Sequence, residues 1–112
     1  MAGERSTNLP LACCDAILIR DAYHHLTEPV DVVRSMAASL KPGGRLAVVD
    51  FPPRPNSAVP AGVPANRAGH GVPMSVVISE VTANGFTLIS QHPLWSPKSQ
   101  PADLFLAVFR KN

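Results

Sequence analysis

The sequence has little of several features that mark particular classes of protein. Charged residues make up only 16% of its 112 residues, ten basic against eight acidic. They form no run of like charges, which argues against a nucleic-acid-binding surface. No apolar stretch approaches the roughly 20 residues that span a membrane. No hydrophobic run follows the first charges, so we expect no signal peptide. The only two cysteines, Cys13 and Cys14, are neighbours and cannot cross-link a secreted scaffold. The sequence therefore predicts one small cytoplasmic domain over residues 1–112.

Proline is the residue type in excess. The chain has 12 prolines, and this is about twice the usual share of roughly 5%. Six of them lie between Pro52 and Pro73. They predict a long Pro-rich loop over residues 52–71, and loops beyond roughly 12–15 residues are usually functional lids or disordered. Residues 1–10 lack an apolar period and are predicted to form a frayed lead-in.

Apolar runs and helical stripes predict the order strand, helix, strand, loop, helix, strand, strand. Ile17, Leu18 and Ile19 are consecutive, which predicts a parallel strand with both faces buried. The predicted strands are 15–20, 45–51, 86–91 and 103–110, and the predicted helices begin at Thr27 and Pro73. The helical stripes are Val30, Val33, Ala37 and Leu40, then Met74, Val77, Ile78 and Val81. This pattern indicates an α/β sheet with a parallel first pair and an antiparallel last pair of strands.

Four pieces of the chain resemble one protein family. They are Leu9-Pro10-Leu11 followed by Cys13-Cys14-Asp15-Ala16-Ile17, the loop Tyr23-His24-His25-Leu26-Thr27-Glu28-Pro29, the segment Leu40-Lys41-Pro42-Gly43-Gly44-Arg45-Leu46, and the closing pair of strands. Together they are similar to the C-terminal half of a class I S-adenosylmethionine-dependent methyltransferase of the small-molecule, ubiquinone-biosynthesis-like kind. The likeness covers about residues 9–110.

The resemblance implies half of a Rossmann-like sheet and methyl transfer from S-adenosylmethionine to a small-molecule acceptor. The family binds this cofactor at a glycine-rich turn after its first strand and at an acidic residue after its second. Nothing before Leu9 supplies either element. We therefore expect the N-terminal cofactor-binding half to be missing here, and the chain alone to be inactive. The first strand would then present an exposed edge, completed by a second copy in a homodimer or by the missing segment.

The candidate site residues follow from the same resemblance. The expected cofactor side is Asp21, Ala22, Tyr23 and His24, and the expected acceptor side is Asp50, His70 and Trp95. The catalytic candidates are His24, His25 and Asp50, because a histidine or carboxylate at the carboxyl edge of a sheet can orient an acceptor hydroxyl or take its proton.

Plainer roles remain open for these residues. The paired histidines can instead shape the loop before Thr27, Asp50 can be a solvated strand end, and His70 and Trp95 can serve packing. No metal site is expected, because the histidines and cysteines lack finger-like spacing and adjacent pairs rarely share one tetrahedral site. Two alternative functions stay open: a non-enzymatic remnant that interacts through the exposed sheet edge, and an unrelated metal- or ligand-binding α/β domain.

Overall fold

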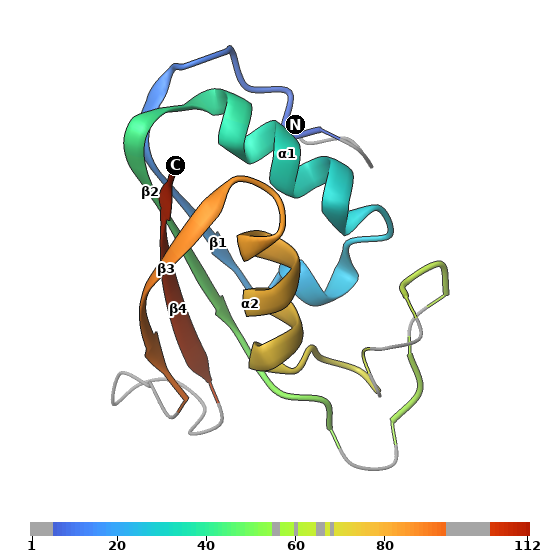
Figure 1. Ribbon diagram of the computed structural model, residues 1–112. Coiled ribbons are helices and arrows are strands. Elements are labelled where there is room, and N and C mark those ends of the chain that lie inside the picture. Colours follow the sequence, from blue (N-terminus) through green and yellow to red (C-terminus); the bar gives the residue numbers. More distant parts are fainter. Residues whose placement is uncertain (1–5, 55–56, 60, 65–66, 68, 94–103) are drawn as a thin grey trace.

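The computed structural model describes residues 6–54, 57–59, 61–64, 67, 69–93 and 104–112. Its elements are β1 (Cys14–Arg20), the 3₁₀ turn η1 (Tyr23–His25), α1 (Pro29–Ser39), β2 (Leu40–Asp50), α2 (Met74–Thr82), β3 (Phe86–His92) and β4 (Phe105–Lys111) (Figure 1). The predicted order of strands and helices is confirmed. β2 is longer than the predicted strand over residues 45–51, because it begins at Leu40 and includes Gly43 and Gly44.

The four strands form one mixed sheet in the order β1-β2-β4-β3. β1 and β2 are parallel, and β4 is antiparallel to both β2 and β3. The parallel first pair and the antiparallel last pair are thus confirmed. β1 lies at one edge of the sheet, as predicted.

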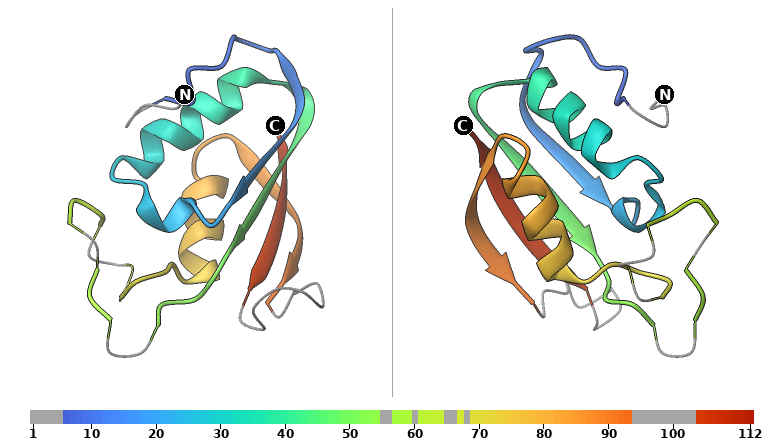
Figure 2. Two further views of the ribbon diagram at one scale, coloured as in Figure 1. Left: turned by 180° about the vertical axis from the view of Figure 1, so that it is seen from behind. Right: turned by 45° about the vertical axis from the view of Figure 1, so that its right-hand side comes forward.

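Both helices cover the same face of the sheet (Figure 2). Ile17 and Ile19 of β1 pack against the core beneath them. Side chains alternate along a strand, so Leu18 faces the other way and is 66% exposed. The prediction that both faces of this strand are buried is therefore wrong. The physical reason is that no described element covers the second face, where Ile89 of β3 is also exposed.

The first helix matches most of its predicted stripe. Val33 and Leu40 are buried and Ala37 packs against the core, whereas Val30 is exposed and Val32 and Met36 are buried as well. The helix begins at Pro29 with Glu28 in the capping position, so Thr27 does not cap it. For α2, Val77 and Val81 are buried as predicted, with Met74 and Ile78 partly buried beside the core.

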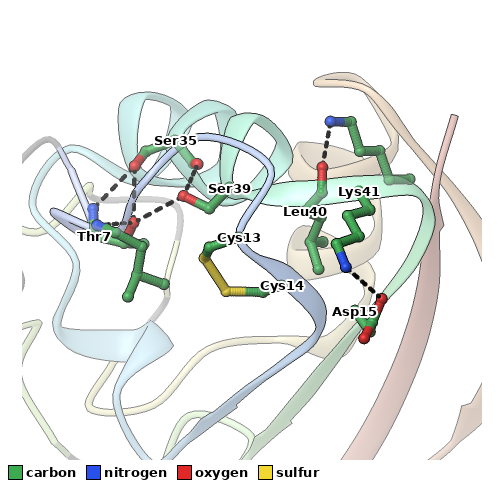
Figure 3. Close-up of a disulfide and its surroundings, with 10 residues drawn as sticks. Thr7, Cys13, Cys14, Asp15, Ser35, Ser39, Leu40 and Lys41 are labelled. Carbon is green, nitrogen blue, oxygen red and sulfur yellow. Dashed lines mark hydrogen bonds and ion pairs between the residues drawn. A yellow bond between two sulfur atoms is a disulfide. The ribbon is translucent and has the colours of Figure 1, made fainter.

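The amino-terminal segment is tied to α1 (Figure 3). The backbone N–H of Thr7 donates to Ser35 Oγ at 2.9 Å, and Ala12 N–H donates to the carbonyl of Ala38. This part of the expected frayed lead-in is therefore held in place. Cys13 and Cys14 form a disulfide between neighbours at the start of β1, which closes only a small local ring and links no separate elements.

The Pro-rich loop is closed at its base. Val72 N–H donates to the carbonyl of Phe51 at 3.0 Å, directly after β2 and just before α2. Gly71 lies so close to Pro52 that a Cβ there would stand 2.6 Å from the Pro52 carbonyl oxygen. Its φ of +131° also suits glycine alone. The close packing of Gly71 on Pro52 thus places the end of the loop beside the end of β2. None of the described helices is long and apolar enough to cross a membrane.

Candidate functional site

The candidate site lies where β1 and β2 end. The two strands are parallel, so their carboxyl ends meet at one edge of the sheet, the place where open α/β folds bind ligands. Asp21 follows β1 with a φ of +53°, and its N–H donates to the carbonyl of Val49 on β2 at 2.9 Å. This sharp departure from the strand directs the chain into η1 and places His24 against Asp50.

His24 and Asp50 form a buried pair across the two strand ends. His24 is 2% exposed and Asp50 0%. His24 Nδ1 lies 2.8 Å from Asp50 Oδ1, and the His24 backbone N–H donates to Oδ2 at 3.0 Å. The Phe51 N–H also donates to Oδ1. Asp50 therefore fixes the orientation of the imidazole and leaves His24 Nε2 as the ring nitrogen that can meet another group.

The carboxyl group of Asp50 is held between opposing influences. Burial raises its pKa, because a charged carboxylate loses its hydration there. The hydrogen bonds from Phe51 and His24 and the nearby His24 ring offset this only in part, so the pKa of Asp50 stays above its usual value. Asp50 is thus no solvated strand end. Its carboxylate is fully buried and bonded to His24, so we describe it as a residue that positions His24.

Two further imidazoles lie beside His24, and we call His24, His25 and His70 the histidine cluster. The ring centroids of His24 and His25 are 4.0 Å apart, those of His24 and His70 5.0 Å, and those of His25 and His70 5.5 Å. The Phe51 ring packs 4.6 Å from the His24 ring. Burial falls across the cluster, from buried His24 through half-buried His70 to exposed His25.

His70 reaches the cluster because its segment of the loop is tied down. Its N–H donates to Ser57 Oγ at 2.8 Å, and its carbonyl accepts from Arg54 N–H at 3.0 Å. The close contact of Gly71 with Pro52 follows immediately. These backbone and hydroxyl contacts hold His70 beside His24.

Tyr23, next to His24 in the sequence, belongs to a different arrangement that we call the Arg67 cluster: Tyr23, Arg67 and Glu80. Arg67 donates from Nη1 to Glu80 Oε2 at 2.7 Å and from Nη2 to Oε1 at 3.1 Å, and the Tyr23 hydroxyl donates to Oε1 at 2.7 Å. Arg67 and Tyr23 are 0% exposed. Burial and the Glu80 carboxylate raise the pKa of Tyr23 well above its usual range, so its hydroxyl stays protonated.

The structure thus brings together four of the predicted catalytic and acceptor residues, which are His24, His25, Asp50 and His70. Asp21 and Ala22 are exposed at the end of β1. The side chain of Tyr23 is used in packing, which leaves only its backbone for contact with a cofactor. Trp95 lies outside the described residues.

Sequence reasoning missed Arg67 and Glu80. Glu80 stands on α2 among apolar residues of the buried stripe, and Arg67 comes from a loop without a period. A lone acidic residue beside such a stripe was the one available signal, and it does not name its partner.

The described residues fit only part of an S-adenosylmethionine site. Exposed Asp21 and Ala22, followed by the η1 backbone, offer polar groups at the carboxyl end of β1. No described strand is followed by a glycine-rich turn that would let backbone approach a nucleotide. These residues would therefore contact one side of the cofactor, with its remaining contacts supplied by other residues.

Comparisons with known proteins agree with this geometry. Residues 2–48 match a family described as a methyltransferase domain. No curated protein matches the sequence. Among solved structures, a SAM-dependent methyltransferase from Aquifex aeolicus has a TM-score of 0.69 at 18% identity, over 99% of this chain and 53% of that one. An S-adenosylmethionine-dependent methyltransferase from Mesorhizobium loti has a TM-score of 0.71 at 16% identity, over 98% and 67%. The [4+2]-cyclase SpnF has a TM-score of 0.72 at 15% identity, over 98% and 55%.

These likenesses concern the fold. The chain spans between 53% and 67% of the three solved proteins while they cover nearly all of it. A [4+2]-cyclase shares the arrangement, so the fold alone does not name a reaction. The chain therefore has an α/β fold, with a four-stranded mixed sheet, that matches part of the fold of these SAM-dependent methyltransferases.

Proposed function

We propose that this chain forms the acceptor-side part of a class I S-adenosylmethionine-dependent methyltransferase that acts on a small molecule. The observation that carries the proposal is the His24–Asp50 pair, buried at the joint carboxyl edge of β1 and β2. The family match over residues 2–48 and the shared fold support it. The cofactor would supply the methyl group, and the acceptor would have to be held in line with it.

In this proposal the chain's own residues divide the work. Asp50 holds the His24 ring through Nδ1 at 2.8 Å, and His24 Nε2 accepts a hydrogen bond or a proton from an acceptor hydroxyl. His25 and His70 line the same place, and Phe51 supplies an apolar wall at 4.6 Å from the His24 ring. Asp21 and Ala22 contact the cofactor from the end of β1.

A titration with S-adenosylhomocysteine tests the cofactor contact directly. The isotope-labelled chain is followed by NMR as the ligand is added, with no metal present. We expect saturable shifts of the backbone amides of residues 21–25 and 50–51. Weak, millimolar-range binding is sufficient, since only one side of the cofactor is contacted.

Two aspartates near opposite ends of β1 provide a test variant and a matched control. Asp21 follows the carboxyl end of β1, and exposed Asp15 lies near its amino end. Asp21→Ala should weaken the binding, and Asp15→Ala should leave it unchanged. Absence of any saturable shift, or shifts centred on Asp15, would overturn the proposed cofactor side.

A second candidate function rests on the bare edge of the sheet. β1 is an edge strand, and its outward-facing Leu18 is 66% exposed, a combination that favours strand pairing with another chain. The candidate is a homodimer of two copies paired along β1. Sedimentation velocity decides between a monomer and a dimer, and Leu18→Lys should dissociate the dimer if this surface forms it.

A further inference from the structure

We propose that His24, His25 and His70 form a binding site for a divalent transition metal ion, with zinc as the first candidate. One ring nitrogen from each of the three lies within 4.8 Å of the others. They come from η1 and from the distant end of the Pro-rich loop, and 45 residues separate His25 from His70 in the sequence. The proposal departs from the sequence expectation of no metal site, because spacing along the chain could not reveal a cluster assembled by the closed loop.

The strongest support is the hydrogen bond behind His24. Histidines that bind metals commonly give their second nitrogen to a carboxylate, which fixes the ring and increases its basicity. His24 Nδ1 makes this contact with buried Asp50 at 2.8 Å. Its Nε2 is then the nitrogen left to bind a metal ion, and Asp50 holds the ring in place.

The distances permit closure onto an ion. Zinc–nitrogen bonds of about 2.0–2.1 Å in a tetrahedron place ligand nitrogens about 3.4 Å apart. The nitrogens here lie within 4.8 Å of one another, so the rings must approach by at most about 1.4 Å. His24 is fixed by Asp50, whereas His25 is exposed and His70 half-buried. Rotation of these two side chains supplies the movement without repacking the core.

The donor set indicates which ions fit. Three neutral imidazoles suit zinc, cobalt, nickel and copper, whereas magnesium and calcium prefer oxygen ligands. Asp50 is directed at His24 and so does not add a charged oxygen to the site. Three protein ligands leave the fourth position of a tetrahedral zinc open, as in catalytic sites. That position lies at the carboxyl edge of β1 and β2, where an acceptor molecule would also bind.

The metal would use the same His24 nitrogen that the proposed methyltransferase assigns to the acceptor. With metal bound, an acceptor oxygen would be activated by the ion, and His24 would act as its ligand. The metal proposal is nevertheless independent of methyl transfer, because it concerns binding of the ion alone.

Calorimetry with the untagged, metal-free chain tests the site. We expect zinc to bind at one ion per chain with a micromolar or lower dissociation constant, and magnesium to give no binding. Cobalt should give the intense visible absorption bands of a tetrahedral complex. If the Cys13–Cys14 disulfide were reduced, its thiolates would also bind zinc. A Cys13→Ser/Cys14→Ser variant must therefore retain the binding.

The histidine variants include a built-in control. His25→Ala and His70→Ala should each weaken zinc binding by roughly 100-fold or more, since even a residue behind the ligands commonly contributes 10–100-fold. His92→Ala removes the fourth histidine of the chain, which is exposed on β3, and should change nothing. Circular dichroism confirms that each variant is folded.

Several results would overturn the metal proposal. Equal binding by wild type and His70→Ala, or loss of binding in His92→Ala, overturns the proposal, as does the absence of one-to-one binding. In those cases the three imidazoles and Phe51 form a packing cluster only. The titration with S-adenosylhomocysteine is done without metal. Its failure would therefore reject the methyltransferase proposal and leave the metal proposal unaffected.

Discussion

Two neighbouring residues, Tyr23 and His24, lead into two different polar clusters. In the Arg67 cluster, both carboxylate oxygens of Glu80 accept hydrogen bonds from Arg67, and one also accepts from Tyr23. In the histidine cluster, Asp50 occupies one nitrogen of His24, and the structure shows no hydrogen bond from the rings of His25 and His70 to the described residues. The first cluster joins the loop to α2 through hydrogen bonds between opposite charges. The second retains donors and acceptors for another molecule.

The hydrogen bonding of the two clusters distinguishes a structural role from a binding role. Buried polar groups are normally hydrogen-bonded, and in the Arg67 cluster a buried guanidinium pairs with a carboxylate. The rings of His25 and His70 have no such partner among the described residues. We therefore expect mutations in the Arg67 cluster to reduce stability, and mutations at the rim of the histidine cluster to reduce binding.

The largest expected effect is from Glu80→Ala, which leaves the buried Arg67 charge without its partner. We expect a loss of about 3–5 kcal/mol in the free energy of unfolding, measured by urea denaturation. Arg67→Met/Glu80→Leu should lose less, because it removes both charges. The control is Lys41→Ala, which breaks the exposed contact of Lys41 with Asp15 at 3.6 Å. It should cost at most about 1 kcal/mol. Similar losses of stability in Glu80→Ala and Lys41→Ala would contradict the structural role assigned to the Arg67 cluster.

Gly71→Ala should have the second largest effect on stability. Gly71 lies at the end of the loop that carries both Arg67 and His70. A φ of +131° and a Cβ position 2.6 Å from the Pro52 oxygen exclude alanine without a shift of backbone. The conformation alone should cost about 1–3 kcal/mol. The displaced loop should also carry His70 away from His24, so zinc binding should fall with stability. Gly43→Ala is the comparison, since Gly43 also has positive φ but nothing lies within 4 Å of its Cβ position. It should leave zinc binding intact.

Tyr23→Phe removes only the hydroxyl that donates to Glu80. A hydrogen bond to a charged group contributes about 1.5–3 kcal/mol, and Arg67 remains to satisfy the carboxylate, so we expect the lower end of that range. Urea denaturation gives the value. Zinc affinity should be unchanged, because the hydroxyl is no part of the histidine cluster. A large loss of zinc binding would show that the two clusters are not separable.

His25→Ala should have the smallest effect on stability. The side chain is exposed, so the free energy of unfolding of the metal-free protein should change by no more than about 0.5 kcal/mol. The difference should appear only with metal. Zinc at about 100 times its dissociation constant should stabilise the wild type by about 2.7 kcal/mol and the variant by far less. Thermal melts with and without zinc provide the measurement.

Much of the fold could be predicted from local pattern. The parallel and antiparallel strand pairs followed from the order of apolar runs and from the lengths of their connections. What failed was the facing of side chains. A continuous run such as Ile17–Ile19 indicates burial on both faces only when both faces are covered, and the two helices lie on one. In the predicted stripe of α1 only Val30 was misplaced, because Val30 and Val32 both continue plausible stripes and only packing decides between them.

The candidate site was predictable in part for the same reason. His24 and Asp50 each end or follow a strand, and parallel strands bring such ends together. The proximity of His70 depends on the Phe51–Val72 hydrogen bond and on the contact of Gly71 with Pro52. These are tertiary contacts across the loop, and periodicity does not encode them. The Arg67–Glu80 pair was invisible for this reason too.

The closed base of the Pro-rich loop has a consequence for how this protein can change over time. His70 is held by contacts near the two ends of the loop, while Ala58 and Ala61 between them are exposed. Lengthening a flexible loop is inexpensive in entropy, at about 0.6 kcal/mol for each doubling. Insertions beside Ala58 should therefore leave His70 in place. The far part of the loop can acquire new sequence, and with it new selectivity for a bound molecule, without disturbing the groups that hold the site together.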